Sequence, residues 1–305
     1  MGLSANQKIL KLLYFLSVVR WYNVLLIFIA QYSLALFVFG PQYSFRQIIL
    51  DGTLHLMIFA TVFTIAGAFI INSFYDSDKD LVNHPKSALV GRVIGQNFLA
   101  NTYFLFNGIA LLFAFFTTKK IFLFYIVYIG LCWFYSHKLQ KKPIVRELSA
   151  SILTMAPLIA VWIHYGVWDW KLLYFFATLL TILFTKDVVK DISGHKGNLI
   201  FGYNTVVVVA GKKNVKYGLI ILNASIFLLF LIIYNYQVSR VHISSNQNLI
   251  IGSSISLVAN TCITLLGISK LKNKYQMMDL ALKFLLLFHI GLLVFTFLVN
   301  QLVTC

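Results

Sequence analysis

The chain has 305 residues, of which 60% are hydrophobic and only 11% are charged, and its mean hydropathy is +0.83. Soluble globular domains carry about 25% charged residues, so this composition excludes an ordinary soluble domain and indicates a membrane protein. The net charge of +16 comes from basic residues in short segments between apolar runs, which excludes a basic nucleic-acid-binding domain.

Nine apolar runs approach the roughly 20 residues that a helix needs to cross a bilayer. The N-terminal residues before the first run lack the short apolar core and cleavage site of a secretory signal, so we expect this run to remain as a transmembrane helix. The sequence therefore predicts an all-α membrane protein with nine transmembrane helices in a single domain over residues 1–305. The nine runs cover residues 22–40, 54–75, 97–117, 121–136, 148–164, 170–187, 215–236, 248–269 and 279–302.

Basic residues are distributed unevenly between the two sides of the predicted bundle. The N-terminal segment and the connections after the second, fourth, sixth and eighth helices hold 20 of the 25 lysines and arginines, and the opposite side holds five. Loops rich in lysine and arginine stay in the cytoplasm. We therefore expect a multi-pass protein of the bacterial inner membrane with these connections on the cytoplasmic side.

Acidic residues are rare, and five of the nine fall into two clusters at the ends of apolar runs. The first cluster follows the second run and the second follows the sixth, so both are predicted on the cytoplasmic side. Positions four apart share one face of a helix, which groups Asn72, Asp76 and Asp80, and separately Asp187 and Asp191. Acids at helix ends are often only solvated loop residues, but two clusters with helical spacing on one side favour a site.

Paired carboxylates from two helices form an oxygen-rich site of the kind that Mg²⁺ prefers, with coordination positions left for substrate phosphate. Such a site suits the ionisation of an allylic diphosphate, because metal and lysine charge stabilises the leaving group. An apolar cavity would shelter the carbocation from water, and 16% of the residues are aromatic, with ring faces that attract cations.

These motifs resemble those of the UbiA superfamily of intramembrane prenyltransferases. The first motif of that family is written NDxxDxxxD, and residues 72–80 read NSFYDSDKD. The second is DxxxD, which matches residues 187–191, and residues 135–139 resemble a YSxxLK loop. The resemblance extends over essentially the whole chain. It implies nine helices around a central cavity. It also implies that Mg²⁺ is bound by Asn72, Asp76, Asp80, Asp187 and Asp191, and that the four aspartates are the catalytic residues.

Six residues are candidates for substrate binding because they match family motifs or lie beside them. Four positions depart from the family pattern and leave open a member with reduced activity: Ser73 in the first motif, Gly194 and Asn198 after the second, and Gln140 where a lysine is usual. The substrate-binding candidates are Asn72, Lys138, Lys141, Arg92, Asn23 and Tyr135.

The resemblance implies Mg²⁺-dependent transfer of a polyprenyl group from its diphosphate donor to an acceptor within the membrane. Residues 83–92 look like those of the geranylgeranylglyceryl phosphate geranylgeranyltransferase branch, which favours a geranylgeranyl donor and a lipid phosphate acceptor. Two alternatives remain. One is an aromatic acceptor on a quinone or pigment pathway. The other, from a different class, is a transporter or non-catalytic lipid binder, although a transporter would be expected to place ionisable residues at the bilayer midplane.

Overall fold

The computed structural model describes residues 5–39, 45–83, 95–167, 169–238, 247–267 and 274–304, and every regular element within these ranges is a helix. The predicted all-α fold is therefore confirmed. The elements are α1 (Ala5–Val19), α2 (Trp21–Leu34), η1 (Ala35–Phe39), α3 (Phe45–Ile49), α4 (Gly52–Asn83), α6 (Gln96–Phe115), α7 (Lys119–His137), η2 (Leu139–Lys141), α8 (Val145–Tyr165), α9 (Trp170–Ser193), α10 (His195–Ile200), α11 (Val206–Val238), α12 (Gln247–Leu266) and α13 (Lys274–Thr304).

Eight helical segments within the described ranges are long and apolar enough to cross a membrane. Each coincides with one of the predicted runs, and the remaining run, 215–236, is also helical and lies within α11. The eight segments are Trp21–Phe39, Gly52–Asp76, Gln96–Phe115, Lys119–Lys141, Val145–Tyr165, Trp170–Ser193, Leu249–Leu266 and Lys274–Phe295.

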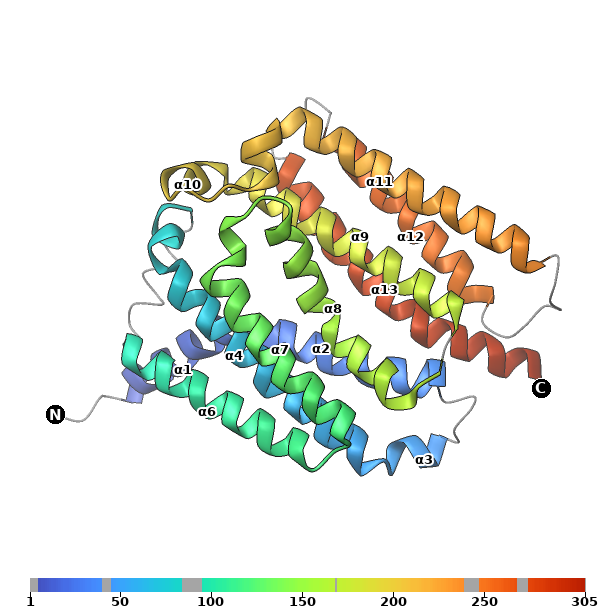
Figure 1. Cartoon of the computed structure of the whole chain (residues 1–305), viewed down its shortest axis with the longest axis horizontal. Helices are drawn as coiled ribbons and strands as arrows, with labels where there is room; N and C mark the ends of the chain where they lie inside the picture. Colours follow the sequence, from blue (N-terminus) through green and yellow to red (C-terminus); the bar gives the residue numbers. More distant parts are fainter. Residues whose placement is uncertain are drawn as a thin grey trace.

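The long helices lie side by side along one axis of the molecule, and α1 and the C-terminal end of α13 are at opposite ends of that axis (Figure 1). The C-terminal ends of α4 and α9, the start of α8 and the short helix α10 all gather at the end nearer to α1 (Figure 1). This is the end at which the two acidic motifs fall. The bundle therefore brings together two segments that are more than 100 residues apart in the sequence.

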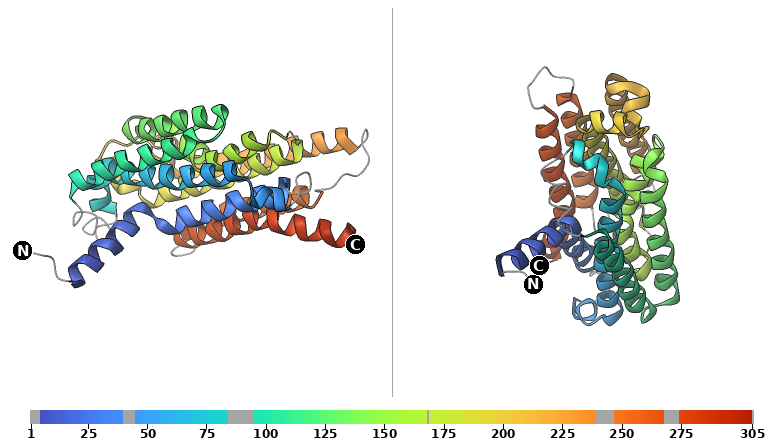
Figure 2. Two further views of the ribbon diagram at one scale, coloured as in Figure 1. Left: turned by 90° about the horizontal axis from the view of Figure 1, so that it is seen from below. Right: turned by 90° about the vertical axis from the view of Figure 1, so that its left-hand side faces the viewer.

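An N-terminal helix that the apolar runs do not predict precedes the first of them. Arg20 adopts a left-handed conformation (φ 52°, ψ 51°), which ends α1 and starts α2 in a new direction. Figure 2 shows α1 leaving the bundle at an angle. Ile9, Leu12 and Leu13 in the first part of α1 are more than half exposed, whereas Val19 near its end joins a core cluster with residues of α2, α4 and α6.

Helix α9 is the central element of the second half of the bundle. It packs against α8, α11, α12 and α13. In its most apolar stretch 67% of the residues are buried, the largest share among the eight candidate spans. Its side chains join the main core cluster through Phe175 and Leu179 and a second cluster through Ile182 and Val189. The second acidic motif is therefore built on the best-packed helix among these spans.

Neutral polar groups inside the bundle form hydrogen bonds between helices. The Gln31 amide of α2 donates to Thr61 Oγ1 of α4 (3.0 Å) and to the Pro157 carbonyl of α8 (2.9 Å). The Asn260 amide of α12 donates to Thr185 Oγ1 of α9 (3.2 Å) and to Asn223 Oδ1 of α11 (2.9 Å). Such bonds are common where polar side chains face the interior of a membrane bundle, and these residues are assigned to packing.

Tyr125 gives a direct test of this packing. Its ring is fully buried in α7, and its hydroxyl donates to the Met57 carbonyl of α4 at 2.8 Å. We expect Tyr125→Phe to lower the free energy of unfolding by about 0.6–1.7 kcal/mol, the range found for hydrogen bonds between membrane helices. The measurement is thermal unfolding in detergent, with Tyr22→Phe at an exposed position as the control. An equal effect of the two substitutions would contradict the assignment.

Candidate active site

Both acidic motifs lie in the last turns of long helices. Helix α4 continues past its apolar run to Asn83, so Asn72, Asp76 and Asp80 occupy successive turns on one side of a continuous helix. Helix α9 likewise continues to Ser193 and carries Asp187 and Asp191 one turn apart. The helical spacing expected from the sequence is confirmed for both motifs.

The acids for which the structure gives burial are not solvated loop residues. Asp191 is only 3% exposed and Asp76 only 9%, and Asp187 is partly buried. Carboxylates are almost never fully buried unless a partner compensates for the loss of hydration. Asp76 and Asp191 are therefore not ordinary solvated acids at helix ends, and other groups of the protein must compensate for their lost hydration.

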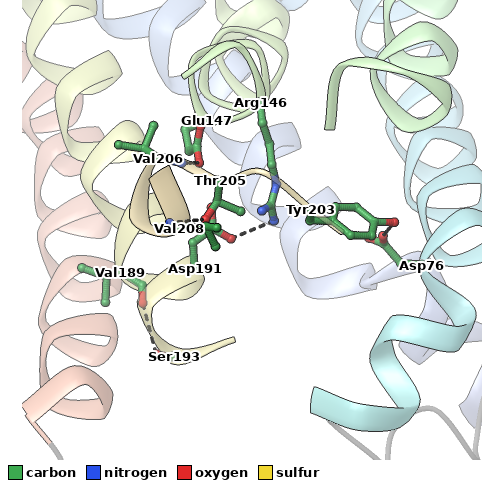
Figure 3. Close-up of polar contacts among 10 residues, drawn as sticks. All are labelled: Asp76, Arg146, Glu147, Val189, Asp191, Ser193, Tyr203, Thr205, Val206 and Val208. Atoms are coloured by element: carbon green, nitrogen blue, oxygen red, sulfur yellow. Dashed lines mark hydrogen bonds and ion pairs between the residues drawn. The ribbon is translucent and has the colours of Figure 1, made fainter. Parts of the chain in front are cut away.

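A chain of polar contacts joins the two motifs (Figure 3). Arg146 Nη2 lies 2.8 Å from Asp191 Oδ1, in an ion pair whose side chains are 10% and 4% exposed. The Arg146 guanidinium also lies 6.0 Å from the centre of the Tyr203 ring, and the Tyr203 hydroxyl donates to Asp76 Oδ1 at 3.2 Å. The order Asp76, Tyr203, Arg146, Asp191 thus bridges α4 and α9 through α8 and the segment before α11.

The first turns of α8 supply most of the groups that hold the second motif. Ile144, immediately before the helix, has a positive φ of 65°, an uncommon conformation for a β-branched residue, and α8 starts at the next position. Besides Arg146, Glu147 Oε1 accepts a hydrogen bond from the Val206 amide at 3.0 Å, and Ser151 Oγ donates to Asp187 Oδ2 at 3.5 Å. One helix end therefore fixes both acids of α9 and the start of α11.

Other charged and polar groups converge on the same place. The Tyr135 hydroxyl, at the end of α7, lies within electrostatic range of Arg146, Asp187, Asp76 and Asp191. Tyr135, a predicted substrate-binding residue, is therefore near both motifs. The Lys190 ammonium likewise lies within range of Asp187, Asp76, Arg20 and Arg146. The site thus has positive as well as negative charge within it.

The other predicted site residues differ in how deeply they are buried. Asn72 is partly buried, and its Oδ1 is enclosed without a hydrogen-bond partner, so an acceptor faces the interior of the bundle. Asn23 lies in the first turn of α2. Lys138 and Lys141 are both exposed. The loop lysines therefore lie at the surface, while the buried cation of the second motif is Arg146.

The structure does not describe the side chains of two predicted residues. Arg92 lies outside the described residues, and Asp80 is described only as part of the backbone of α4. Gln140, at the position where the family loop has a lysine, is buried and donates to the Ser136 carbonyl at 2.6 Å, so it closes the end of α7. Among the side chains that the structure describes, no three His, Cys, Asp or Glu residues are close enough together to hold a metal.

The donor types at the ends of α4 and α9 fit a hard divalent cation, although the three described carboxylates are not close enough together to hold it by themselves. Asp76, Asp187 and Asp191 offer carboxylate oxygens, and Asn72 offers a buried amide oxygen that has no protein partner. Mg²⁺ prefers oxygen ligands and is usually held by one or two carboxylates together with substrate phosphate and water. The residues present are therefore those that a Mg²⁺-phosphate complex requires, and they do not favour a soft metal.

Several residues of this site were not among the predicted ones. They are Arg146, Glu147 and Ser151 of α8 and Tyr203 of the segment before α11. Glu147 is the one glutamate of the sequence, and it follows Arg146 directly at the start of an apolar run. Because the chain has only nine acids, an adjacent pair of arginine and glutamate at the start of an apolar run was the sequence feature that could have indicated site residues on α8.

An apolar cavity of about 520 Å³ lies beside the first motif, between α4, α6 and α7. Ile71 and Tyr75 line it from α4, Tyr103 from α6 and Trp133 from α7. None of the acidic residues lines it. The cavity therefore adjoins the polar site without being part of it, and it is of a size that accommodates small hydrophobic ligands.

Comparisons with known proteins agree with this arrangement. The model of the UbiA prenyltransferase family matches residues 33–244, which is more than two thirds of the chain. A search of curated proteins finds no match.

Several solved structures are similar to the chain over most of its length. One, of a digeranylgeranylglyceryl phosphate synthase, has a TM-score of 0.68 and 17% identity, and covers 94% of this chain and 98% of its own. A UbiA homologue from Archaeoglobus fulgidus bound to DMAPP and Mg²⁺ has a TM-score of 0.64 and 17% identity, with 92% and 99% covered. An apo UbiA homologue from Aeropyrum pernix K1 has a TM-score of 0.61 and 15% identity, with 87% and 96% covered. At these identities the likeness shows the fold.

Proposed function

The chain belongs to the UbiA prenyltransferase family, and from this premise we propose that it transfers a geranylgeranyl group from its diphosphate to a lipid acceptor such as geranylgeranylglyceryl phosphate, with Mg²⁺ as cofactor. The observation that carries the proposal is the meeting of two buried acidic motifs, bridged by Tyr203 and Arg146, at one end of a membrane bundle. Neither buried carboxylates nor a buried arginine are needed to make a helical bundle stable in a membrane.

We assign the binding of Mg²⁺ to Asp76, Asp80, Asp187 and Asp191 together with the amide oxygen of Asn72. When bound, Mg²⁺ supplies positive charge that neutralises the diphosphate and favours breakage of its bond to the allylic carbon. The structure of the similar Archaeoglobus fulgidus homologue, bound to DMAPP and Mg²⁺, supports this assignment.

The side chains of the chain itself contribute charge, position and exclusion of water. Arg146 and Lys190 place positive charge beside the acids, where negative charge develops on the leaving diphosphate. The Tyr203 hydroxyl fixes the orientation of the Asp76 carboxylate. Packing of α4, α8 and α9 around the acids keeps water from the allylic cation until the acceptor oxygen attacks it.

We infer that the acceptor is a lipid that carries a phosphate group. A phosphate-bearing lipid acceptor is supported by the basic residues near the site, among them Arg146, Lys138 and Lys141, and by the similarity to a digeranylgeranylglyceryl phosphate synthase. An aromatic acceptor remains the alternative within the family. The transporter alternative is disfavoured, because the acids of both motifs stand at one end of their helices and the polar groups that join the middles of the spans, such as Gln31 and Asn260, are neutral.

We propose that the site faces the cytoplasm, in a bacterial inner membrane. The cytoplasmic orientation is supported by the basic residues, 20 of 25 of which fall on the side of the acidic motifs. A single cysteine introduced at exposed Lys142, in a chain lacking its three native cysteines, is expected to react with a membrane-impermeant maleimide only in inverted vesicles. Labelling from the outside of intact cells would reverse the orientation.

Removal of the acids is the direct test of the mechanism. We expect Asp76→Ala and Asp187→Ala each to abolish the release of pyrophosphate from geranylgeranyl diphosphate in the presence of Mg²⁺ and acceptor, because each removes a carboxylate of the metal site. The assay measures pyrophosphate from purified protein. Asp279→Ala is the matched control, since Asp279 forms only a surface ion pair with Lys283 within α13.

Full activity of both site variants, or of the wild-type protein with all metal chelated, would contradict the mechanism. A comparable loss in Asp279→Ala would indicate general damage instead.

The acceptor is tested by comparing substrates under identical conditions. With geranylgeranyl diphosphate and Mg²⁺, we expect product formation with geranylgeranylglyceryl phosphate and at least tenfold less with an aromatic quinone precursor, on the basis that a hydrogen-bonded anionic group contributes about 1.4 kcal/mol or more. Mass spectrometry of the extracted lipids measures both products. The reverse preference would leave the family assignment standing and replace the acceptor.

A further inference from the structure

The cation that meets the second acidic motif is part of the protein. Arg146 Nη2 and Asp191 Oδ1 are 2.8 Å apart, and both side chains are at least nine-tenths buried. At this distance and in this degree of burial the charges of the guanidinium and the carboxylate largely cancel for any third group nearby. Asp191 therefore has a resident counter-charge beside it without a metal ion, and the buried Glu147 is a second acid within electrostatic range of the same guanidinium.

The other acid of the motif is in a different situation. The Ser151 hydroxyl donates to the Glu147 carbonyl at 2.8 Å and lies 3.5 Å from Asp187 Oδ2, while Lys186, Lys190 and Arg146 act on the Asp187 carboxylate only through longer-range electrostatics. Asp187 and Asp191 are one turn apart on the same helix, so they would otherwise act as an equivalent pair. The structure distinguishes them, because α8 presents an arginine to one and a serine to the other.

The guanidinium also has a donor left over. Arg146 Nη1 is buried and has no hydrogen-bond partner. A buried guanidinium donor without a partner is costly, and an arginine side chain holds its donors in a fixed planar fork that suits two anionic groups at once. The ring of Tyr203 lies against the same group at 6.0 Å and limits where it can move.

We propose that Arg146 serves as a resident cation of the diphosphate site, compensating Asp191 so that one fewer divalent ion is taken up when diphosphate binds. The inference rests on the proposed function, because it concerns a site that binds diphosphate together with Mg²⁺. Asp191 Oδ1 is held by Arg146 at 2.8 Å. Arg146 is thus a positioning residue that replaces part of the charge a metal ion would supply.

The consequence is measurable as a linkage between two ligands. If n Mg²⁺ ions accompany the binding of inorganic pyrophosphate, the logarithm of its association constant rises with the logarithm of free Mg²⁺ concentration with slope n. Arg146→Gln removes the positive charge of Arg146 and leaves the Asp191 carboxylate without its ion-pair partner. We expect the slope to increase by about one ion, with pyrophosphate binding weakened about tenfold at low Mg²⁺ and recovered at high Mg²⁺.

Isothermal titration calorimetry of the full-length protein in detergent, with inorganic pyrophosphate at a series of free Mg²⁺ concentrations, gives this slope without requiring prenyl transfer. Arg46→Gln is the matched control, because Arg46 is exposed in α3 at the other end of the bundle, and its slope should equal that of the wild type. Arg146→Lys keeps a positive charge beside Asp191, so its slope should also equal the wild-type slope.

Equal slopes for wild type and Arg146→Gln would overturn the inference. So would a folded Arg146→Gln protein that fails to bind pyrophosphate at any Mg²⁺ concentration, because added metal should replace a missing charge. If Arg146→Gln does not fold, Arg146→Lys decides, and a slope increased by one in that variant overturns the inference. Failure of the wild-type protein to bind pyrophosphate with Mg²⁺ would instead contradict the proposed function, and the inference with it.

Discussion

The structure depends on how negative charge is kept inside an apolar bundle. Carboxylates that leave water for the end of a membrane-spanning helix are costly unless another group compensates for the lost hydration. Here Arg146 compensates Asp191 and the Tyr203 hydroxyl bonds Asp76, so the helices that carry the two motifs are held at a distance set by these side chains. The packing of α8 between α7 and α9 then follows from the need to deliver Arg146 to that position.

Neutral and charged polar groups are separated along the bundle. Gln31, Asn223 and Asn260 form hydrogen bonds between helices within their spans, and these bonds tie helices to one another without introducing charge. The charged groups of the site stand at one end, where α4 and α9 extend past their apolar runs (Figure 1). This separation lets the apolar part of the bundle remain a medium for an isoprenoid chain, while the reacting diphosphate stays near water.

Much of the fold was predictable because hydrophobic length and helical spacing are local properties. The apolar runs, the continuation of helix through Asp76 and Asp191, and the pairing of the motifs on one side all followed from the sequence. The bridge itself did not, because Tyr203 and Asp76 are 127 residues apart and no periodicity links them. The burial of Arg146 was not predictable for a similar reason: sequence proximity to a motif does not distinguish exposed Lys138 from buried Arg146, and the role of the loop lysines stays a prediction.

The hydrogen bond between Glu147 and the Val206 amide gives the site a mechanical property. The segment that carries Tyr203 ends at Val206, and its bond to Glu147 fastens it to the same helical turn that carries Arg146 (Figure 3). Any displacement of this segment that admits a headgroup must strain its contacts with α8 and with α4 together. The position of Tyr203 against Asp76 on α4 is therefore coupled, through one short segment, to the turn of α8 that carries Arg146.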